Sequence, residues 1–454
     1  MPFATVNPAT GLTEQTFEAH TPEEVEAKVA RAYATYLEYR RTSFAERSRL
    51  LITAAELMEA EVPDMARILT TEMGKTFAAA KGEVSKCAMS MRWFADNAEA
   101  LLADEVVASA AKKSYLRFEP LGVVLAVMPW NFPLWQVIRF AAPALMLGNT
   151  GLLKHASNVP QSALLLEDVF RRAGFPEGVF TTLLIEAKDV APLIEDPRIA
   201  AVTLTGSEGA GMAVASAAGH ALKKSVMELG GSDAFVVLES ADLAATARAA
   251  ASARTINNGQ SCIAAKRFIV VEPVAEEFTR LFVEAMSSLV VGDPFDPATN
   301  VGPIVSEAQR QELLHQIEEA KQEGAVVACG GTVPDRPGWY LDPTVLTNIK
   351  PDMEVAQQEL FGPVALVLEV PDLDAAIAAA NSTTFGLGSS VWGTDQTQLD
   401  RCVREIEAGS VFVNAAVASN PELPFGGIKR SGFGRELSEV GLKEFCNVKT
   451  VWIS

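Results

Sequence analysis

Three polar residues, spaced widely along the chain, have side chains suited to covalent catalysis. Cys262 ends the small polar loop NNGQSC, which leads into an apolar segment. Backbone N–H groups at such a junction can lower the pKa of a thiol and make it a nucleophile, although a lone free cysteine is as often a buried structural residue. Asn131 lies between the prolines of PWNFP, and Glu228 precedes the turn of MELGG.

Asn131 and Glu228 could complete the chemistry that a thiol nucleophile needs. The two prolines hold the Asn131 amide rigidly, as an oxyanion hole requires, whereas the commonest use of asparagine is in turns. Glu228 could be a general base with a raised pKa, or a surface carboxylate beside a flexible turn. No histidine stands in a motif that would activate Cys262, so a papain-like hydrolase has little support. A hydride that leaves to a nicotinamide needs no proton donor, which agrees with this histidine-poor pattern.

Two further segments could hold a nucleotide. Lys154 and Ser157, in LLKHASN, stand between a predicted strand and a predicted helix. A cation and a capping hydroxyl there could bind a ribose or a phosphate, and the simpler interpretation is a helix cap beside a solvated lysine. Gly206 and Ser207 open a loop of order GxxGxG, which by itself is a weak nucleotide signal.

The cysteines and histidines do not predict a metal site. The five cysteines are odd in number, far apart and free of CxxC pairs, and none of the four histidines has metal-ligand spacing to another. These patterns argue against zinc and against a disulfide framework.

The elements that must position these residues follow an α/β pattern. Residues 22–100 are predicted to be helical from Thr21, which begins a capping box with Glu24. Strands are then predicted in LGVVLAVMPW and at 150–154, 178–184 and 200–205, with Ser157 or Asn158 as the cap of a helix that has Pro160 in its first turn. Strands that alternate with crossover helices indicate a doubly wound parallel sheet.

The same pattern restarts near residue 229 and predicts a second α/β domain. Its strands are GSDAFVVL, RFIVV, ALVLEV and SSVWG, with helices near 242–257, 273–290, 306–323 and 372–381. We therefore expect two α/β domains, the first at 1–103 and 120–228 and the second at 229–442, and a separate β-prone element at 104–119 and 443–454.

Composition agrees with an enzyme of two or three domains. The chain has 454 residues, 49% of them hydrophobic, and a net charge of −19. Such an acidic surface repels nucleic acid. The N-terminal residues do not read as a signal peptide, and no uncharged apolar stretch reaches the roughly 18 residues of a membrane span, so a cytoplasmic location is expected.

Seven strings, in order along almost the whole chain, resemble the aldehyde dehydrogenase superfamily. They are PWNFP (129–133), LLKHAS (152–157), TGS (205–207), MELGG (227–231), GQSC (259–262), ELFGPV (359–364) and PFGGIKRSGFGRE (424–436), and Glu228 and Cys262 have the family's usual interval of 34. The resemblance implies a Rossmann-type cofactor domain, a second α/β catalytic domain and a small β oligomerisation element that builds a homodimer or homotetramer.

The resemblance also implies a mechanism. Cys262 attacks the aldehyde carbon, and Asn131 and the Cys262 N–H stabilise the oxyanion. Hydride passes to the nicotinamide and leaves a thioester, which a water activated by Glu228 hydrolyses. The family's cofactor residues correspond here to Trp130, Lys154, Ser157, Gly206, Ser207, Leu229, Glu359 and Phe361. NAD-preferring members often have glutamate where this chain has Ser157, and a glutamate would repel a 2′-phosphate, so we predict NADP as the preferred cofactor and NAD as the second.

The substrate prediction rests on Arg139, eight residues after Asn131 on a predicted helix with apolar neighbours. Succinate-semialdehyde dehydrogenases resemble this chain in having arginine there, where it grips the substrate carboxylate, and serine at the place of Ser419. Trp135 and Ser261 would complete the substrate site. Many of these enzymes have a second arginine where this chain has Ile256, and some family members have a second cysteine where it has Ala264, so a redox-switch disulfide should be absent.

We therefore predict oxidation of succinate semialdehyde to succinate, in 4-aminobutyrate breakdown or in a bypass of the citric-acid cycle. The alternatives are an aldehyde dehydrogenase for glutarate semialdehyde or other small aldehydes, a catalytically silent relative, and, most remotely, a nicotinamide-independent cysteine acyl hydrolase.

Overall fold

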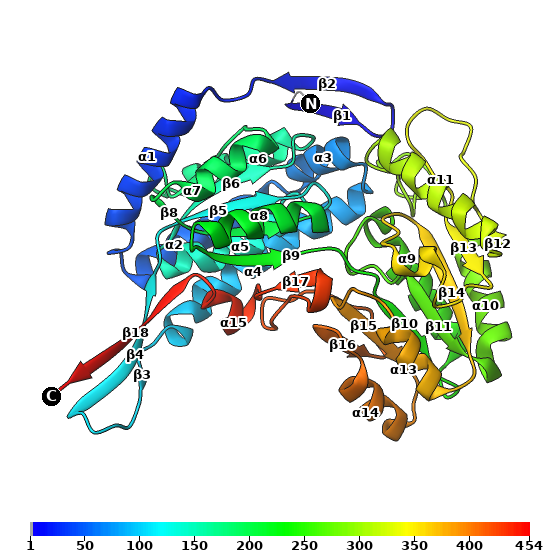
Figure 1. Ribbon diagram of the computed structural model, residues 1–454. Coiled ribbons are helices and arrows are strands. Elements are labelled where there is room, and N and C mark those ends of the chain that lie inside the picture. Colours follow the sequence, from blue (N-terminus) through cyan, green and yellow to red (C-terminus); the bar gives the residue numbers. More distant parts are fainter. Residues whose placement is uncertain (1–2) are drawn as a thin grey trace.

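The computed structural model describes residues 3–454, and six of its strands form a first sheet (Figure 1). They are β5 (Val123–Met128), β6 (Thr150–His155), β7 (Phe180–Thr182), β8 (Ile199–Thr205), β9 (Lys224–Glu228) and β17 (Gly432–Phe433). In space their order is β17-β9-β8-β5-β6-β7, and all neighbours are parallel except the pair of β17 and β9. The strands read as apolar runs because helices cover both faces of the sheet.

The order in which the chain adds strands to this sheet changes direction beside β5. The chain runs from β5 to β6 and β7 on one side, and then crosses to β8 and β9 on the other side. In open α/β sheets such a switch point leaves a crevice at the carboxyl ends of the two central strands. The loops that follow β5 and β8, which begin at Pro129 and Gly206, therefore meet at this crevice.

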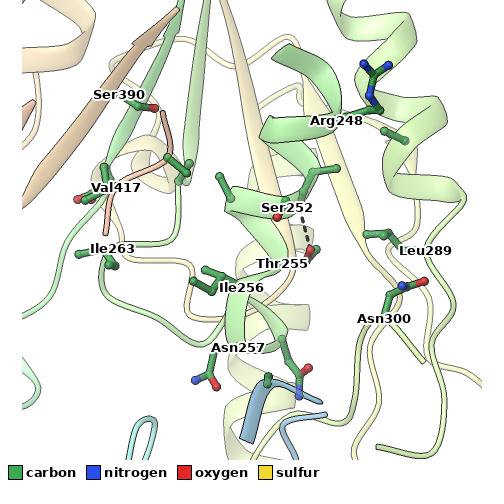
Figure 2. A pocket seen from close by; sticks show the side chains of 18 of the residues that line it. Arg248, Ser252, Thr255, Ile256, Asn257, Ile263, Leu289, Asn300, Ser390 and Val417 are labelled. Atoms are coloured by element: carbon green, nitrogen blue, oxygen red, sulfur yellow. Dashed lines mark hydrogen bonds between the residues drawn. The ribbon is translucent and has the colours of Figure 1, made fainter. Parts of the chain in front are cut away.

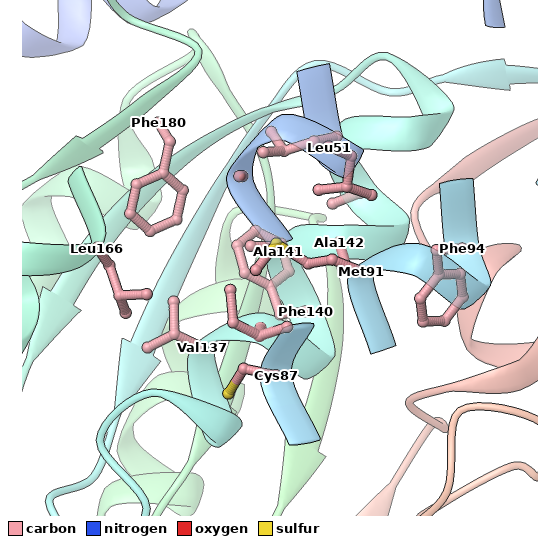
Figure 3. Close-up of a cluster of buried hydrophobic side chains, with 14 of the residues drawn as sticks. Leu51, Cys87, Met91, Phe94, Val137, Phe140, Ala141, Ala142, Leu166 and Phe180 are labelled. Carbon is pink, nitrogen blue, oxygen red and sulfur yellow. The ribbon is translucent and has the colours of Figure 1, made fainter. Parts of the chain in front are cut away.

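Two layers of helices pack on the first sheet. The layer on one face contains α2 (Phe44–Ala60), α3 (Val62–Met73), α4 (Phe77–Leu101), α5 (Trp135–Leu147) and α6 (Pro160–Arg172). Figure 3 shows the apolar side chains between them, among them Cys87 and Met91 of α4 and Val137 and Phe140 of α5. The other face is covered by α1 (Pro22–Tyr39), α7 (Val190–Glu195) and α8 (Glu208–His220).

A second sheet of seven strands carries the remaining chemistry. Its strands, in spatial order, are β12 (Val326–Cys329), β13 (Thr344–Thr347), β14 (Val364–Val370), β11 (Arg267–Val271), β10 (Ala234–Val237), β15 (Gly388–Trp392) and β16 (Ser410–Val413). Only β12 is antiparallel to its neighbour. One face packs on α9 (Leu243–Thr255) and α10 (Glu272–Ser287), and the other on α11 (Glu307–Gln322), α12 (Glu354–Gln357), α13 (Leu373–Asn381) and α14 (Gln396–Glu405).

Two small antiparallel sheets lie outside these layers. The hairpin of β1 (Phe3–Asn7) and β2 (Leu12–Phe17) begins the described chain. The strands β3 (Glu105–Val106), β4 (Lys113–Pro120) and β18 (Cys446–Ile453) form a three-stranded arm that projects from the molecule, with the C-terminus at its tip (Figure 1). The short helix α15 (Ser438–Leu442) precedes β18.

The predicted α/β class and the main strands are confirmed, with local differences. The strands in GSDAFVVL, RFIVV, ALVLEV and SSVWG are β10, β11, β14 and β15, whereas β12, β13 and β16 were not predicted. The strand β17 returns to the first sheet although residues 432–433 fall in the range predicted as catalytic. No described helix combines the length and apolar character of a membrane span.

Helix caps gave one correct and one wrong prediction. Thr21 caps α1 and shares a capping box with Glu24, as predicted. Neither Ser157 nor Asn158 caps α6, which begins after Val159 without a side-chain cap from that residue. The Glu72 carboxylate of α3 instead accepts hydrogen bonds from the first-turn N–H groups of Gln161 and Ser162, at 2.8 and 3.0 Å. A tertiary contact therefore replaces the local cap.

Candidate active site

A cleft of about 290 Å³ opens at the switch point of the first sheet. Eight of the residues singled out in the sequence line it: Trp130, Asn131, Gly206, Ser207, Leu229, Cys262, Glu359 and Phe361. The loops after β5 and β8 form one wall, and segments next to the second sheet form the other. A crevice at this place in a doubly wound sheet is where dinucleotides bind.

The loop that carries Cys262, residues 256–262, is fastened to the PWNFP loop by asparagine side chains. The Asn257 amide donates hydrogen bonds to the carbonyl oxygens of Asn131 and Gln260, at 2.8 and 2.9 Å. The Asn131 amide donates to the same Gln260 carbonyl at 3.2 Å. Asn257 and Asn258 have φ angles of 55° and 58°, which asparagine tolerates better than most residues. The sequence analysis missed both residues, and their adjacency before Gly259 was the signal for a left-handed backbone.

The Cys262 thiol is half-buried, and burial and nearby charges act on its pKa in opposite directions. Burial raises its pKa to about 12, while the positive charges of Arg139 and Lys266 act to lower it. The Lys266 ammonium donates hydrogen bonds to the carbonyl oxygens of Ser261 and Cys262, at 2.8 and 2.6 Å. Sequence reasoning missed Lys266, because a lysine just before a strand gives no sign that it is fully buried.

Glu359 and two aromatic rings shape the rest of the cleft. One Glu359 carboxylate oxygen accepts a hydrogen bond from the Gly231 N–H at 2.9 Å and lies 3.7 Å from the Lys266 ammonium. The rings of Trp130 and Phe361 meet edge to face, with centroids 5.6 Å apart. A carboxylate beside aromatic surfaces can hold a ribose and a nicotinamide ring.

Glu228 is buried at the end of β9 and does not line the cleft. Neither carboxylate oxygen has a hydrogen-bond partner among the described residues. Burial, and next the negative charge of Glu436, raise the pKa of Glu228 well above its usual value. Burial without a hydrogen-bond donor thus disfavours the charged form of this carboxyl.

Arg139 of α5 is also buried, and it already has an anionic partner. Its Nε atom lies 2.7 Å from the Glu436 carboxylate, and its guanidinium carbon lies 4.5 Å from the centroid of the Phe425 ring. The side chain also donates to the Thr205 hydroxyl at 3.4 Å. The sequence analysis included Glu436 in a quoted motif but did not identify it as the partner of Arg139.

Trp135 and Ser419, both expected at the substrate, lie together. The Trp135 indole N–H donates a hydrogen bond to the Ser419 hydroxyl oxygen at 3.0 Å. Lys86 of α4, which sequence reasoning missed, donates to the same oxygen at 3.1 Å and stands 4.4 Å from the centroid of the Trp135 ring. Ser261 is fully buried, and its hydroxyl has no hydrogen-bond partner among residues 3–454.

Lys154 lies near the carboxyl end of β6, and Ser157 lies in the loop that follows this strand. Lys154 is half-buried, and burial lowers its pKa. Ser157 is half-buried, and neither residue lines the 290 Å³ cleft.

A larger cavity of about 490 Å³ lies next to the Cys262 loop (Figure 2). Asn257 and Ile263 line it, together with Ser252, Ile256 and Val417. The loop thus contributes Cys262 to the cleft at the switch point and its neighbours to this second cavity. Ile256 is 42% exposed and brings no charge to the wall.

Comparison with known proteins agrees with this geometry. A model of the aldehyde dehydrogenase family matches residues 1–451. The chain is 56% identical to succinate-semialdehyde dehydrogenase (NADP⁺) 1 of Mycobacterium tuberculosis, with 100% of both chains covered. It is 55% identical to succinate-semialdehyde dehydrogenase (NADP⁺) of Mycobacterium avium, with 100% of this chain and 97% of the relative covered.

Solved structures have the same fold. A succinic semialdehyde dehydrogenase from Streptococcus pyogenes, in complex with NADP⁺ as the cofactor, superposes with a TM-score of 0.97 at 37% identity and covers 99% of each chain. A structure of Gox0499 superposes with a TM-score of 0.99 at 42% identity over 100% of each chain. This chain belongs to the aldehyde dehydrogenase family.

Proposed function

We propose that this protein oxidises succinate semialdehyde to succinate and uses NADP as the hydride acceptor. The reaction type is supported most directly by one observation. The Cys262 thiol and the Asn131 amide share one cleft at the switch point of a doubly wound sheet. Support for this aldehyde and this cofactor comes from the names of relatives that are 56% identical over the whole chain.

The chain's own residues divide the chemistry between them. The Cys262 thiolate attacks the aldehyde carbon, and the Asn131 amide and the Cys262 N–H donate hydrogen bonds to the oxyanion that forms. When bound, NADP accepts the hydride and so turns the adduct into a thioester. Glu228, once deprotonated, takes a proton from the water that hydrolyses the thioester. Lys266 keeps the Cys262 carbonyl in place through its 2.6 Å hydrogen bond.

The cleft fits a dinucleotide. Ser207 caps α8, so the N-terminus of that helix faces the cleft as a site for the pyrophosphate. Trp130, Gly206, Leu229, Glu359 and Phe361 would hold the nicotinamide half. Lys154 would meet the adenosine ribose, and Ser157 leaves room for a 2′-phosphate that a glutamate would repel.

The substrate's carboxylate would lie near Trp135, Ser419 and Arg139. Ser261 would line the approach to the thiol. Because Ile256 supplies no second arginine, glutarate semialdehyde and other small aldehydes stay rival substrates. Activity with an uncharged aldehyde equal to that with succinate semialdehyde would favour the other small aldehydes, and higher activity with glutarate semialdehyde would favour that substrate.

Further features of the enzyme are proposals of the same kind. Residues 1–103 and 120–228 would bind the cofactor, 229–442 would carry catalysis, and the arm of 104–119 and 443–454 would join subunits into a homodimer or homotetramer. The net charge of −19 supports a cytoplasmic enzyme without nucleic-acid partners. Breakdown of 4-aminobutyrate or a bypass of the citric-acid cycle would supply the aldehyde.

The test is a panel of aldehydes with each cofactor. Purified protein with succinate semialdehyde and NADP should yield succinate and reduced NADP in equal amounts, and Cys262→Ala should yield neither. A protein that forms no acid from any aldehyde would contradict the proposal. Hydrolysis of an activated ester without aldehyde oxidation would instead favour the cysteine hydrolase.

A further inference from the structure

Lys266 is a buried cation that contacts the backbone of the nucleophile itself. It stands just before β11 and is fully buried. Its ammonium donates hydrogen bonds to the carbonyl oxygens of Ser261 and Cys262, at 2.8 and 2.6 Å. Because the removal of an ammonium from water is costly, a lysine that directs two of its three hydrogens to consecutive carbonyl groups of a catalytic loop indicates a specific task.

The second sheet and two carboxylates hold the ammonium in this place. The Lys266 N–H donates to the Asp233 carbonyl at 3.1 Å, and the Lys266 carbonyl accepts from the Leu366 N–H at 2.9 Å. A Glu359 carboxylate oxygen lies 3.7 Å from the ammonium. Burial lowers the pKa of Lys266, and the negative charges of Glu359 and Asp233 oppose that effect. The cation is therefore compensated without being drawn away from the loop.

The hydrogen bond to the Ser261 carbonyl also sets the direction of the Cys262 N–H. Both groups belong to one peptide unit, which is planar and trans, so the C=O and the N–H point in opposite directions. A fixed ammonium on the oxygen thus fixes the plane of the unit and directs the N–H away from Lys266. It also polarises the unit, because hydrogen bonds at the two ends of a peptide group strengthen each other.

The Cys262 N–H is not engaged elsewhere. Among residues 3–454 no atom accepts a hydrogen bond from it, whereas the nearby Ala264 N–H donates to the Ser261 carbonyl at 3.2 Å. Cys262 lines the cleft together with Asn131. In the proposed reaction this N–H and the Asn131 amide donate to the oxyanion, and such donors contribute most when they are held in place beforehand.

The preceding carbonyl group of the loop is held by neutral side chains. The Gln260 carbonyl accepts hydrogen bonds from the amides of Asn131 and Asn257, at 3.2 and 2.9 Å. Three carbonyl groups in succession are therefore fixed by side chains from elsewhere. The peptide unit that carries the Cys262 N–H is the first of them to be held by a charged donor, Lys266.

The adjacent Arg267 is a buried cation with a different target. Its guanidinium donates to the carbonyl oxygens of Ser232, Ala379 and Ala380, at 2.9, 2.7 and 2.9 Å. None of the three lies in the loop that carries the thiol. Lys266 and Arg267 thus form a natural pair for comparison, because both are buried cations that bind carbonyl groups and only Lys266 binds those of the nucleophile.

We propose that Lys266 is a positioning residue of the oxyanion hole. By holding and polarising the Ser261 carbonyl, it directs the Cys262 N–H toward the aldehyde oxygen. This inference rests on the proposed function and assigns to one side chain the placement of one of the two oxyanion donors.

The test compares two reactions of the same thiol. Oxidation of succinate semialdehyde needs the thiolate and the oxyanion hole, whereas alkylation by iodoacetamide needs the thiolate alone, because that displacement forms no oxyanion. Both are measured on the full-length enzyme at one pH with saturating NADP, and mass spectrometry follows alkylation of the Cys262 peptide. Dividing kcat/KM for the aldehyde by the rate constant for alkylation removes any effect of Lys266 on the pKa of the thiol.

Lys266→Met should lower this quotient by roughly 10- to 100-fold, somewhat less than the loss of a whole oxyanion donor. Asn131→Ala, which removes the other donor, should lower it as well. Lys266→Gln keeps a shorter, neutral donor and should lower it less, and this variant replaces Lys266→Met if that protein does not fold. Arg267→Met is the matched control, and its quotient should equal that of the wild type even where lost stability lowers both rates.

The outcomes separate the two proposals. A wild-type quotient in the Lys266 variants would overturn this inference, because Lys266 would then act only through the charge of the thiol or through stability. Equal decreases in Lys266→Met and Arg267→Met would overturn it too. A wild-type enzyme that is alkylated but oxidises no aldehyde would overturn the proposed function instead. Hydrolysis of an activated ester, which also forms an oxyanion, would then take the place of aldehyde oxidation in the quotient.

Discussion

The surroundings of Cys262 disfavour its thiolate, and single residues set the pKa of the thiol. Burial raises the pKa of its thiol to about 12, and the charges of Arg139 and Lys266 oppose that effect. Lys266 also holds the carbonyl oxygens on both sides of the Ser261–Cys262 peptide unit, so it acts on the position of the nucleophile as well as on its charge. Two buried cations on different elements thus act on one thiol.

Ser157 is the residue on which the cofactor prediction depends. Ser157→Glu would place a carboxylate beside the adenosine ribose, where it repels a 2′-phosphate and accepts hydrogen bonds from a free 2′-hydroxyl. The ratio of kcat/KM with NADP to that with NAD should fall by roughly 10-fold or more. Steady-state rates with both cofactors measure it. Ser216→Glu, on the exposed side of α8, is the control, and an unchanged ratio in Ser157→Glu would refute the assignment.

Among individual residues, the sequence analysis identified those that belong to a motif and missed those whose importance comes from a contact with a distant part of the chain. Cys262, Asn131 and Glu359 were predicted from motifs that lie in order along the chain, and all three line the cleft. Lys86 and Glu436 gave no local signal, because the partner of each comes from a distant segment. Arg139 was predicted as a substrate-binding residue, but its pairing with the buried Glu436 could not be deduced from spacing.

Among the elements, α6 shows how a long-range contact can replace a local signal. Its first turn binds the carboxylate of Glu72, which also accepts hydrogen bonds from the hydroxyls of Ser162 and Thr5, at 2.7 and 2.9 Å. One buried side chain thereby joins α3, α6 and β1. The neighbouring Ser157 therefore has no capping role in α6.

Glu72→Ala should destabilise the protein far more than the loss of an exposed cap. The substitution leaves buried N–H donors of α6 without partners, so we expect a loss of about 2–4 kcal/mol in the free energy of unfolding. Denaturant titration of the purified variant measures it. The matched variant Thr21→Ala, which removes the exposed cap of α1, should cost about 1 kcal/mol. Equal losses would show that Glu72 is no more than a local cap.

Strands and helices were predictable where the apolar pattern was long and uninterrupted. The run from Val123 to Met128 gave β5, and the alternation after residue 229 gave β10, β11, β14 and β15. The short edge strands β12 (VVAC) and β16 (SVFV) were missed although their residues are mostly apolar, because an apolar run of four residues does not distinguish a strand from other structure. The α6 cap was predicted wrongly because its partner lies 89 residues earlier in the chain.

At the scale of the whole molecule, the arm is the part that lacks a packing partner in one chain. Val106 is 77% exposed, and Trp452 and Ile453 near the C-terminus are 55% and 43% exposed. An extended antiparallel sheet with apolar residues at its tip is suited to pairing with another chain. The sequence predicted these two segments, and their role in assembly is a proposal.

Replacing Trp452 and Ile453 with aspartate should dissociate the oligomer. Two buried charges in an interface that apolar residues stabilise would weaken it by several kcal/mol, so light scattering should give the mass of one chain. Leu222→Asp, at a 95% exposed position after α8, is the control and should keep the wild-type mass. An oligomer that survives the double substitution would exclude the arm as its main contact.

The central claim is that oxidation passes through an acyl group on Cys262, and the most direct measurement is to trap that group. Glu228→Gln should form the thioester but hydrolyse it slowly, because the amide cannot accept a proton from water. Mixed with succinate semialdehyde and NADP, it should release one equivalent of reduced NADP in a burst, and mass spectrometry should find one succinyl group on the Cys262 peptide. A burst without an adduct, or an adduct on another residue, would contradict the account.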